Sequence, residues 1–266
     1  MTEPTIHELF DLTGRVAMVT GASGHLGSSI AAALAEAGAS VVVSSRALDR
    51  AQATAAALPC LNGAVHHGVE LDYMDDESLE RGFASAVEAA GQVDVVVNNG
   101  YDYACARDLT KVTGDEFRRQ QGNTAGYFLL ARALRDHVVE RGVPASVIML
   151  GSMYGLVASY PDAYEGVSAP SPVTYHAFKG GVMQMTRHLA TYWACDGVRV
   201  NSLCPGPFPN PAGAPAAMVE RLCTKSPMGR MGRPHELKGA AVFLASDASS
   251  YMTGQNLVID GGWTAW

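Results

Sequence analysis

The sequence predicts an α/β fold of the Rossmann type, a single-domain, doubly wound parallel sheet of about seven strands flanked by helices. Two observations predict it. Short, strongly apolar runs alternate along the chain with longer helical patterns, which is the order of βαβ units. A glycine-rich turn directly follows the first of these runs. No internal repeat or linker divides the chain, so residues 1–266 are expected to form one dinucleotide-binding and catalytic domain.

The first strand and helix carry the glycine-rich turn. After a lead-in, residues 16–20 form an apolar run that ends at a glycine, and residues 28–37 form an alanine-rich helical pattern. Glycines let the backbone approach a pyrophosphate, and a helix N-terminus offers it free N–H groups. We therefore favour cofactor binding over a plain tight turn, through Gly21, Ser23, Gly24, His25, Leu26 and Gly27.

The exit of the second strand, residues 41–46, indicates which cofactor is bound. An acid at this place would hydrogen-bond the ribose 2′-hydroxyl of NAD, whereas this strand ends in Ser45 and Arg46. A hydroxyl and a guanidinium suit a 2′-phosphate. Asp49 lies slightly later and supports the competing NAD interpretation. We therefore expect NADP(H) to be preferred, with NAD(H) as the alternative.

The alternation continues through the middle of the chain, with helices expected at 49–58 and 76–90 and strands at 64–69, 93–97 and 146–150. Thr113 is expected to cap a helix that begins near Asp115 and contains Asn123. Asn123 is either a helix-packing or surface position or a buried polar relay. Ser152 follows a strand, at the sheet edge where ligands of open α/β sheets bind, and is either a turn residue or a hydroxyl placed for chemistry.

Tyr175 and Lys179 are four residues apart in a helix expected over residues 175–196, so they lie on one face. A free tyrosine has a pKa near ~10 and is a poor base at neutral pH. A neighbouring cation lowers that pKa and allows proton transfer near neutrality. Because this spacing also occurs by chance on solvated helix faces, the pair needs support from its neighbours in the fold.

The segments on either side of this helix are expected to cover a substrate. Residues 156–174 form a long loop rich in proline and tyrosine, and residues 207–226 form a possible lid with a short helix at 214–224. The last elements are strands at 199–203 and 257–260 and a helix at 234–245. Aromatic residues that either line a substrate pocket or pack ordinarily are Tyr101, Tyr154, Tyr160, Tyr164, Phe208 and Trp263.

Composition argues against several other classes of function. The formal net charge is −7 and no basic run occurs, which disfavours a nucleic-acid partner or an anionic membrane surface. The sequence shows neither a signal peptide nor an apolar stretch long enough to span a membrane. Its five cysteines are scattered and its eight histidines lack metal-ligand spacing. We therefore expect no metal and a reducing, cytoplasmic location.

These motifs, in this order, resemble the short-chain dehydrogenase/reductase family over essentially the whole chain. The resemblance implies that Tyr175 is the catalytic acid/base and that Lys179 lowers its pKa and holds the nicotinamide ribose. It implies that Ser152 hydrogen-bonds the reacting oxygen and that Asn123 sustains a water-linked proton relay to Lys179. Asn98 resembles the residue that steadies the central strand. The cofactor contacts that it adds are Asp72, Tyr73, Asn99, Gly100, Pro205, Gly206 and Phe208.

The sequence departs from the family pattern in three places. The turn glycines follow the spacing Gly21, Gly24, Gly27, whereas single-domain members usually place the middle glycine two residues before the last. The usual Asn-Asn-Ala-Gly is replaced by a run that ends in Tyr101, which puts a bulky ring near the cofactor floor. The gap of 23 residues between Ser152 and the tyrosine is longer than the family norm and indicates an added substrate loop.

The activity that the resemblance implies is reversible hydride transfer between NADP(H) and the ketone or secondary alcohol of a small molecule, as in a carbonyl reductase. The aromatic residues would suit a sugar-like or polyol substrate, or an aromatic ketone. Two alternatives stay open: a catalytically silent regulatory protein that binds a nicotinamide cofactor, and an epimerase or dehydratase on the same fold. The family also implies a homotetramer.

Overall fold

A single sheet forms the centre of the computed structural model, which describes residues 3–103, 105 and 109–265. Its strands are β1 Val16–Thr20, β2 Ser40–Ser45, β3 His67–Glu70, β4 Val95–Asn98, β5 Ala145–Leu150, β6 Val198–Pro205 and β7 Asn256–Ile259. They lie in the order β3-β2-β1-β4-β5-β6-β7, and each neighbouring pair is parallel. The predicted doubly wound parallel sheet of seven strands is therefore confirmed.

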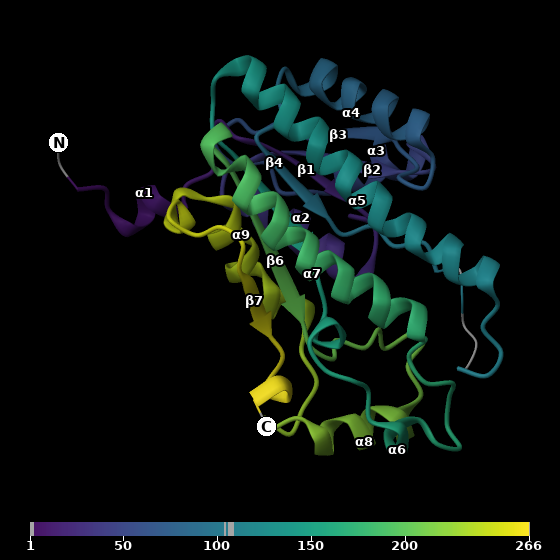
Figure 1. Cartoon of the computed structure of the whole chain (residues 1–266). Helices are drawn as coiled ribbons and strands as arrows, with labels where there is room; N and C mark the ends of the chain where they lie inside the picture. Colours follow the sequence, from purple (N-terminus) through teal and green to yellow (C-terminus); the bar gives the residue numbers. More distant parts are fainter. Residues whose placement is uncertain (1–2, 104, 106–108, 266) are drawn as a thin grey trace.

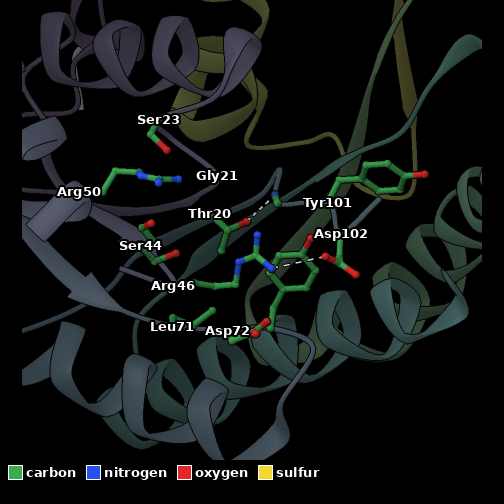
Figure 2. A pocket seen from close by; sticks show the side chains of 13 residues that line it. Thr20, Gly21, Ser23, Ser44, Arg46, Arg50, Leu71, Asp72, Tyr101 and Asp102 are labelled. Atoms are coloured by element: carbon green, nitrogen blue, oxygen red, sulfur yellow. Dashed lines mark hydrogen bonds and ion pairs between the residues drawn. The ribbon is translucent and has the colours of Figure 1, made fainter. Parts of the chain in front are cut away.

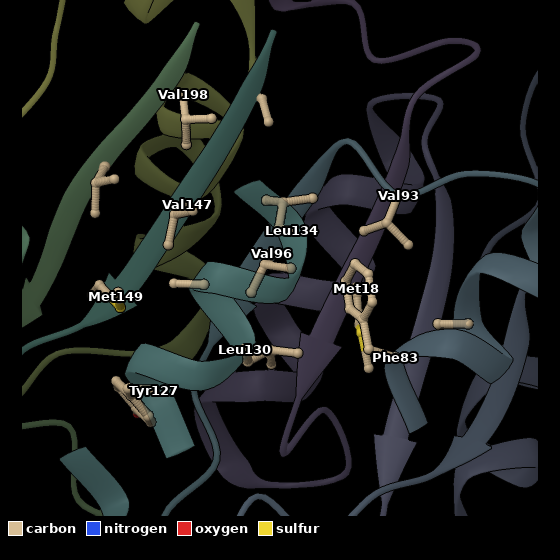
Figure 3. Packing of buried hydrophobic residues seen from close by; sticks show 14 of the residues in the cluster. Met18, Phe83, Val93, Val96, Tyr127, Leu130, Leu134, Val147, Met149 and Val198 are labelled. Carbon is tan, nitrogen blue, oxygen red and sulfur yellow. The ribbon is translucent and has the colours of Figure 1, made fainter. Parts of the chain in front are cut away.

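Helices cover both faces of this sheet because successive strand residues point to opposite sides. Met18 and Val96 pack against α4 and α5 on one face, as Figure 3 shows, while Val19 and Val97 pack on the other. The first face carries α4 Asp76–Ala90, α5 Gly114–Arg141 and α7 Val173–Trp193, and the second carries α2 His25–Glu36, α3 Leu48–Ala56 and α9 Lys238–Ala245 (Figure 1). Strands buried on both faces explain the continuous apolar runs in the sequence.

The longest helix, α5, has clear signals at both ends. The hydroxyl of Thr113 accepts a hydrogen bond from the Glu116 N–H, and the Glu116 side chain accepts one from the Thr113 N–H. This capping box confirms the predicted cap. Gly142, in the left-handed conformation at φ 66°, ends the helix. The result is a 28-residue helix that carries Asn123 in its first half.

The strand order reverses between β1 and β4, because the chain goes from β1 outward to β3 and then crosses back to β4. At such a switch point the loops leave neighbouring strands in opposite directions and open a crevice at the carboxyl ends. The glycine turn follows β1, the Asn99 turn follows β4, and Ser152 follows β5. The fold therefore brings the predicted motifs to one edge of the sheet.

Several predicted boundaries were wrong. Helix α2 begins at His25 instead of residue 28, so the last part of the glycine turn is already helical. The segment 156–174 is not structureless, because it contains α6 Pro161–Tyr164 and the first residues of α7. The segment 234–245 is a 3-10 turn, Pro234–Leu237, followed by α9. The N-terminal lead-in contains α1 Ile6–Phe10, with a capping box at Thr5 that sequence reading overlooked.

Helix α8, Ala216–Lys225, forms within the segment predicted as a lid. In Figure 1 it lies beside α6, beyond the carboxyl ends of the strands. None of the helices in the described part of the chain is long and apolar enough to cross a membrane.

Candidate active site

The glycine turn between β1 and α2 is held closed by Asn99. The Asn99 amide donates hydrogen bonds to the carbonyl oxygens of Thr20 at 2.9 Å and Gly21 at 3.1 Å. Gly21 has a φ of +63°, which favours glycine, and a Cβ at Gly27 would overlap the Gly21 carbonyl oxygen. A Cβ at Gly24 would meet only that oxygen, at 3.1 Å. Gly21 and Gly27 are therefore required by the turn, whereas Gly24 is much less constrained.

The turn fits a pyrophosphate. It brings the first turn of α2 next to a backbone that side chains cannot crowd, and free N–H groups at a helix N-terminus bind phosphate oxygens. His25 is the first residue of α2. Its Nε2 atom is buried and has no hydrogen-bond partner in the described structure.

A pocket rich in charged side chains opens beyond β1 and β2, and Figure 2 shows it from close by. We call it the charged pocket. Its lining residues are Thr20, Gly21, Ser23, Ser44, Ser45, Arg46, Arg50, Leu71, Asp72, Tyr73, Gly100, Tyr101 and Asp102. Seven of these were predicted as cofactor contacts, and they come from the carboxyl ends of four strands, β1 to β4: Gly21, Ser23, Ser45, Arg46, Asp72, Tyr73 and Gly100.

Two charged residues of this pocket were missed in the sequence. Arg50 lies four residues after Arg46, in the first turn of α3, and adds a second guanidinium. The spacing of four residues between the two arginines could have indicated in the sequence that both lie near the same site. Asp102 follows the Asn99 turn and forms ion pairs with Arg46 at 3.5 Å and with Arg119 at 3.1 Å. No local pattern marks Asp102, because its partners lie in other parts of the chain. The arginines suit an anionic group such as a 2′-phosphate.

A second pocket lies on the other side of the switch point, between the ends of β4, β5 and β6. We call it the tyrosine niche. Its lining residues are Leu26, Asn99, Tyr101, Leu150, Gly151, Ser152, Tyr175, Lys179, Pro205, Gly206 and Phe208. It thus unites residues predicted as catalytic, Ser152, Tyr175 and Lys179, with residues predicted beside the nicotinamide. Tyr101 is shared with the charged pocket, so the two pockets adjoin.

Burial governs the electrostatics of the tyrosine niche. It raises the pKa of Tyr175, and a hydrogen bond with the Ser152 side chain opposes this change. Lys179 is 4% exposed, and burial lowers its pKa to about 7. Its Nζ donates a hydrogen bond to the Leu150 carbonyl at 2.5 Å and lies 5.7 Å from the centre of the Tyr175 ring. Desolvation therefore has the largest effect on the pKa of Tyr175, and Lys179 is not its main determinant.

Asn123 lies outside both pocket linings and is fully buried. Its Oδ1 accepts a hydrogen bond from the Asp102 N–H at 2.8 Å, and its Nδ2 donates to the carbonyls of Asp102 at 3.2 Å and Gln120 at 2.8 Å. The side chain therefore fixes the turn after β4 to helix α5. Gly24, His25 and Gly27 also lie outside the linings, within the turn that supports them.

Tyr101 sits where the two pockets meet. Its ring packs edge-on against Tyr175, with centroids 5.4 Å apart at 84°, and stacks on Phe178 at 5.8 Å. Its hydroxyl is buried without a hydrogen-bond partner in the described structure. The ring therefore lies between the two pockets and packs against the candidate acid/base from the side.

The segments predicted as substrate loop and lid are joined to each other. Lys225 of α8 forms an ion pair with Asp162 of α6 at 2.5 Å, and Arg221 donates hydrogen bonds to the carbonyls of Asp162 at 3.1 Å and Glu165 at 2.6 Å. We call these contacts the latch. Beneath them, the hydroxyls of Tyr154 and Tyr164 are 2.7 Å apart, and Tyr160 packs edge-on against Trp263 at 5.4 Å.

Comparison with known proteins agrees with this geometry. The family described as enoyl-(acyl carrier protein) reductase matches residues 21–264. The chain is similar to a galactitol 2-dehydrogenase (L-tagatose-forming) of Cereibacter sphaeroides, with 36% identity over 97% of this chain and 98% of that protein.

Solved structures give the same picture. A short-chain type dehydrogenase/reductase from Mycobacterium marinum matches with a TM-score of 0.86 and 32% identity, covering 99% of this chain and all of that one (100%). A gluconate 5-dehydrogenase from Burkholderia cenocepacia, in complex with NADP and tartrate, matches with a TM-score of 0.87 and 30% identity, over 98% and 100% of the two chains.

Proposed function

Since this chain belongs to the short-chain dehydrogenase/reductase family and is an NAD(P)-dependent oxidoreductase that acts on CH–OH groups, we propose that it transfers a hydride reversibly between NADP(H) and a secondary alcohol or ketone of a small molecule. The observation that carries this proposal is the joint placement of Ser152, Tyr175 and Lys179 in one niche. That niche adjoins the glycine turn and the charged pocket, as a dinucleotide extended across the switch point requires.

The protein's own part in the reaction is proton transfer and stabilisation of charge. When bound, the nicotinamide supplies or accepts the hydride. In reduction, the Tyr175 hydroxyl gives its proton to the substrate oxygen, and the Ser152 hydroxyl donates a hydrogen bond to the same oxygen as negative charge develops on it. Burial keeps the pKa of Tyr175 raised, so the phenol stays protonated until it is needed. The Lys179 ammonium then favours the phenolate that is left.

For the cofactor we propose NADP(H). Arg46, Arg50 and Ser45 line the charged pocket, and the two guanidiniums complement a 2′-phosphate. The NADP bound to the gluconate 5-dehydrogenase of similar fold supports this choice. Asn123 would support a proton relay by fixing the turn after β4, because its side chain hydrogen-bonds both the N–H and the carbonyl of Asp102.

For the substrate we propose a polyol or sugar acid. The region beyond the niche combines aromatic faces with hydroxyls, in particular the Tyr154–Tyr164 pair. Such a wall can stack on the apolar face of a carbon chain and hydrogen-bond its hydroxyls. Galactitol and gluconate, named for the similar proteins, belong to this chemical class. A homotetramer in the cytoplasm remains part of the proposal, on the strength of the family resemblance and the scattered free cysteines.

Tyr175→Phe tests the assignment of the acid/base. Removing the hydroxyl should lower kcat by roughly 10²–10⁴-fold, the range for a positioned proton donor, and leave the Kd of NADPH nearly unchanged. Tyr192→Phe is the matched control, because Tyr192 lies on the same helix and its side chain is 70% exposed. Turnover is followed by NADPH absorbance with a panel of ketoses, polyols and sugar acids. Full turnover by Tyr175→Phe would show the assignment to be wrong.

The same panel separates the alternatives. Tight NADPH binding with no turnover of any substrate would favour the regulatory protein. Conversion of a substrate without net change in NADPH absorbance would favour an epimerase or dehydratase.

A further inference from the structure

Asp102 is a fixed negative charge at the rim of the charged pocket. It follows the Asn99 turn at the end of β4, and its side chain is only 14% exposed. In Figure 2 its carboxylate faces Arg46 across the pocket, and the ion pair connects the exit of β4 with the exit of β2. The pocket that would receive an anionic phosphate therefore already contains an anion beside its arginine.

The protein holds this carboxylate in place from two directions. The Asp102 N–H donates to Asn123 Oδ1 at 2.8 Å, and its carbonyl accepts from Gln120 Nε2 at 3.1 Å and Asn123 Nδ2 at 3.2 Å. On the side-chain end, Arg119 donates to Oδ2 at 3.1 Å. Asp102 thus keeps one cationic partner on helix α5, independently of the pocket.

Arg46 is the more loosely held of the two arginines that pair with Asp102. Its contact with Asp102 is the longer of the two ion pairs, at 3.5 Å, and its side chain is 69% exposed. An exposed arginine can exchange partners at little cost, because its interactions are screened by water. It can therefore stay on Asp102 or turn to an arriving phosphate, while Arg119 neutralises the carboxylate in either case.

We propose that Asp102 is a specificity-determining residue: an internal counter-ion for Arg46 that lets the pocket accept NAD as well as NADP. With NAD, which has a ribose 2′-hydroxyl, Arg46 keeps its partner. With NADP, the 2′-phosphate has to take Arg46 away from Asp102. This cost falls on NADP alone. The pocket consequently discriminates less strongly between the two cofactors than its arginines would by themselves. This inference rests on the proposed binding of a nicotinamide cofactor.

The test is the ratio of the Kd values of NAD and NADP, measured by calorimetric titration of the whole protein without substrate. Asp102→Asn keeps the shape and the main-chain contacts and removes the charge. It should raise the ratio Kd(NAD)/Kd(NADP) by about two- to fivefold, the range for a partly exposed ion pair. The increase should shrink at high salt, because screening weakens the interaction that is being removed. An unchanged or lower ratio in Asp102→Asn overturns the proposal.

Two controls make the result specific. Asp115→Asn removes one negative charge from the first turn of α5, where the side chain pairs with Arg118 and lies outside the pocket lining. It should leave the ratio unchanged, and a change equal to that of Asp102→Asn would assign the effect to net charge instead. In an Arg46→Gln background, Asp102→Asn should lose its effect, and a persisting effect also contradicts the proposal. Because the readout is binding, a failure of the proposed hydride transfer is seen separately, as absent turnover.

Discussion

The charged pocket and the tyrosine niche place positive charge in opposite surroundings. In the pocket, the Arg46 side chain is 69% exposed and has a carboxylate partner. In the niche, Lys179 is 4% exposed, and its hydrogen-bond partner is the Leu150 carbonyl. Water screens the first charge, so it contributes modestly to affinity, whereas the second is desolvated and burial moves its pKa to about 7. The exposed Arg46 is therefore suited to selecting a ligand in the charged pocket, whereas the buried Lys179 is suited to proton-transfer chemistry in the tyrosine niche.

Lys179→Met is expected to have the largest effect on activity. It removes the buried cation that favours the Tyr175 phenolate, so kcat should fall by roughly 10²–10⁴-fold, as for other groups that set proton transfer. The measurement is turnover with the substrate found in the panel. A loss of less than about tenfold would show that burial of the tyrosine, and not the lysine, governs the proton transfer.

The same variant should be more stable than the wild type at low pH. The pKa of Lys179 is about 7 in the folded protein and near 10.5 in the unfolded chain, so the unfolded state binds more protons between these values. The cost of burying the ammonium is therefore complete below pH 7 and disappears as the pH rises toward 10.5. Lys179→Met should gain roughly 1–3 kcal/mol at pH 6, after loss of the Leu150 hydrogen bond is subtracted. Denaturant unfolding at pH 6 and pH 9 checks this, because the gain should shrink at pH 9.

Gly27→Ala tests the glycine turn, which lies between the charged pocket and the tyrosine niche. The added Cβ would overlap the Gly21 carbonyl and press on the Asn99 amide, which closes the turn. The Kd of NADPH should rise at least about tenfold, since the N–H groups of α2 lose their placement. Gly24→Ala is the matched control, because its Cβ would meet only the Gly21 oxygen, at 3.1 Å, and it should change the Kd by less than about threefold. Equal losses in the two variants would contradict this difference.

The parts of this site that are formed by short local motifs could be predicted from the sequence. Ser152 was predicted at the sheet edge where ligands bind, and the glycine turn and the Tyr175–Lys179 pair were recognised as local motifs. Sequence reading overlooked Asp102, whose significance comes from Arg46 and Arg119, 56 and 17 residues away in the chain. It also described 156–174 as a loop, since Pro161–Tyr164 is too short to show a helical period. Contacts between side chains that are far apart in the chain leave no local pattern in the sequence.

Arg46 and Lys179 differ both in exposure and in distance from the candidate acid/base, so comparing them does not show which difference matters. The latch allows the two to be tested separately. Lys225 and Asp162 lie near the tyrosine niche, yet their side chains are 26% and 62% exposed, whereas Lys179 is 4% exposed. The hydrogen bond from Lys225 lowers the pKa of Asp162, so the pair is intact at neutral pH and is lost only as acid protonates the carboxylate. If exposure decides, Lys225→Met should change kcat/KM by less than about fivefold at pH 7, despite its place beside the catalytic end. If the position beside the catalytic end matters more than exposure, the loss of kcat/KM should approach that of Lys179→Met. Steady-state kinetics of the two variants on one substrate distinguish these outcomes, and a small change would assign the dominant role of Lys179 to its burial.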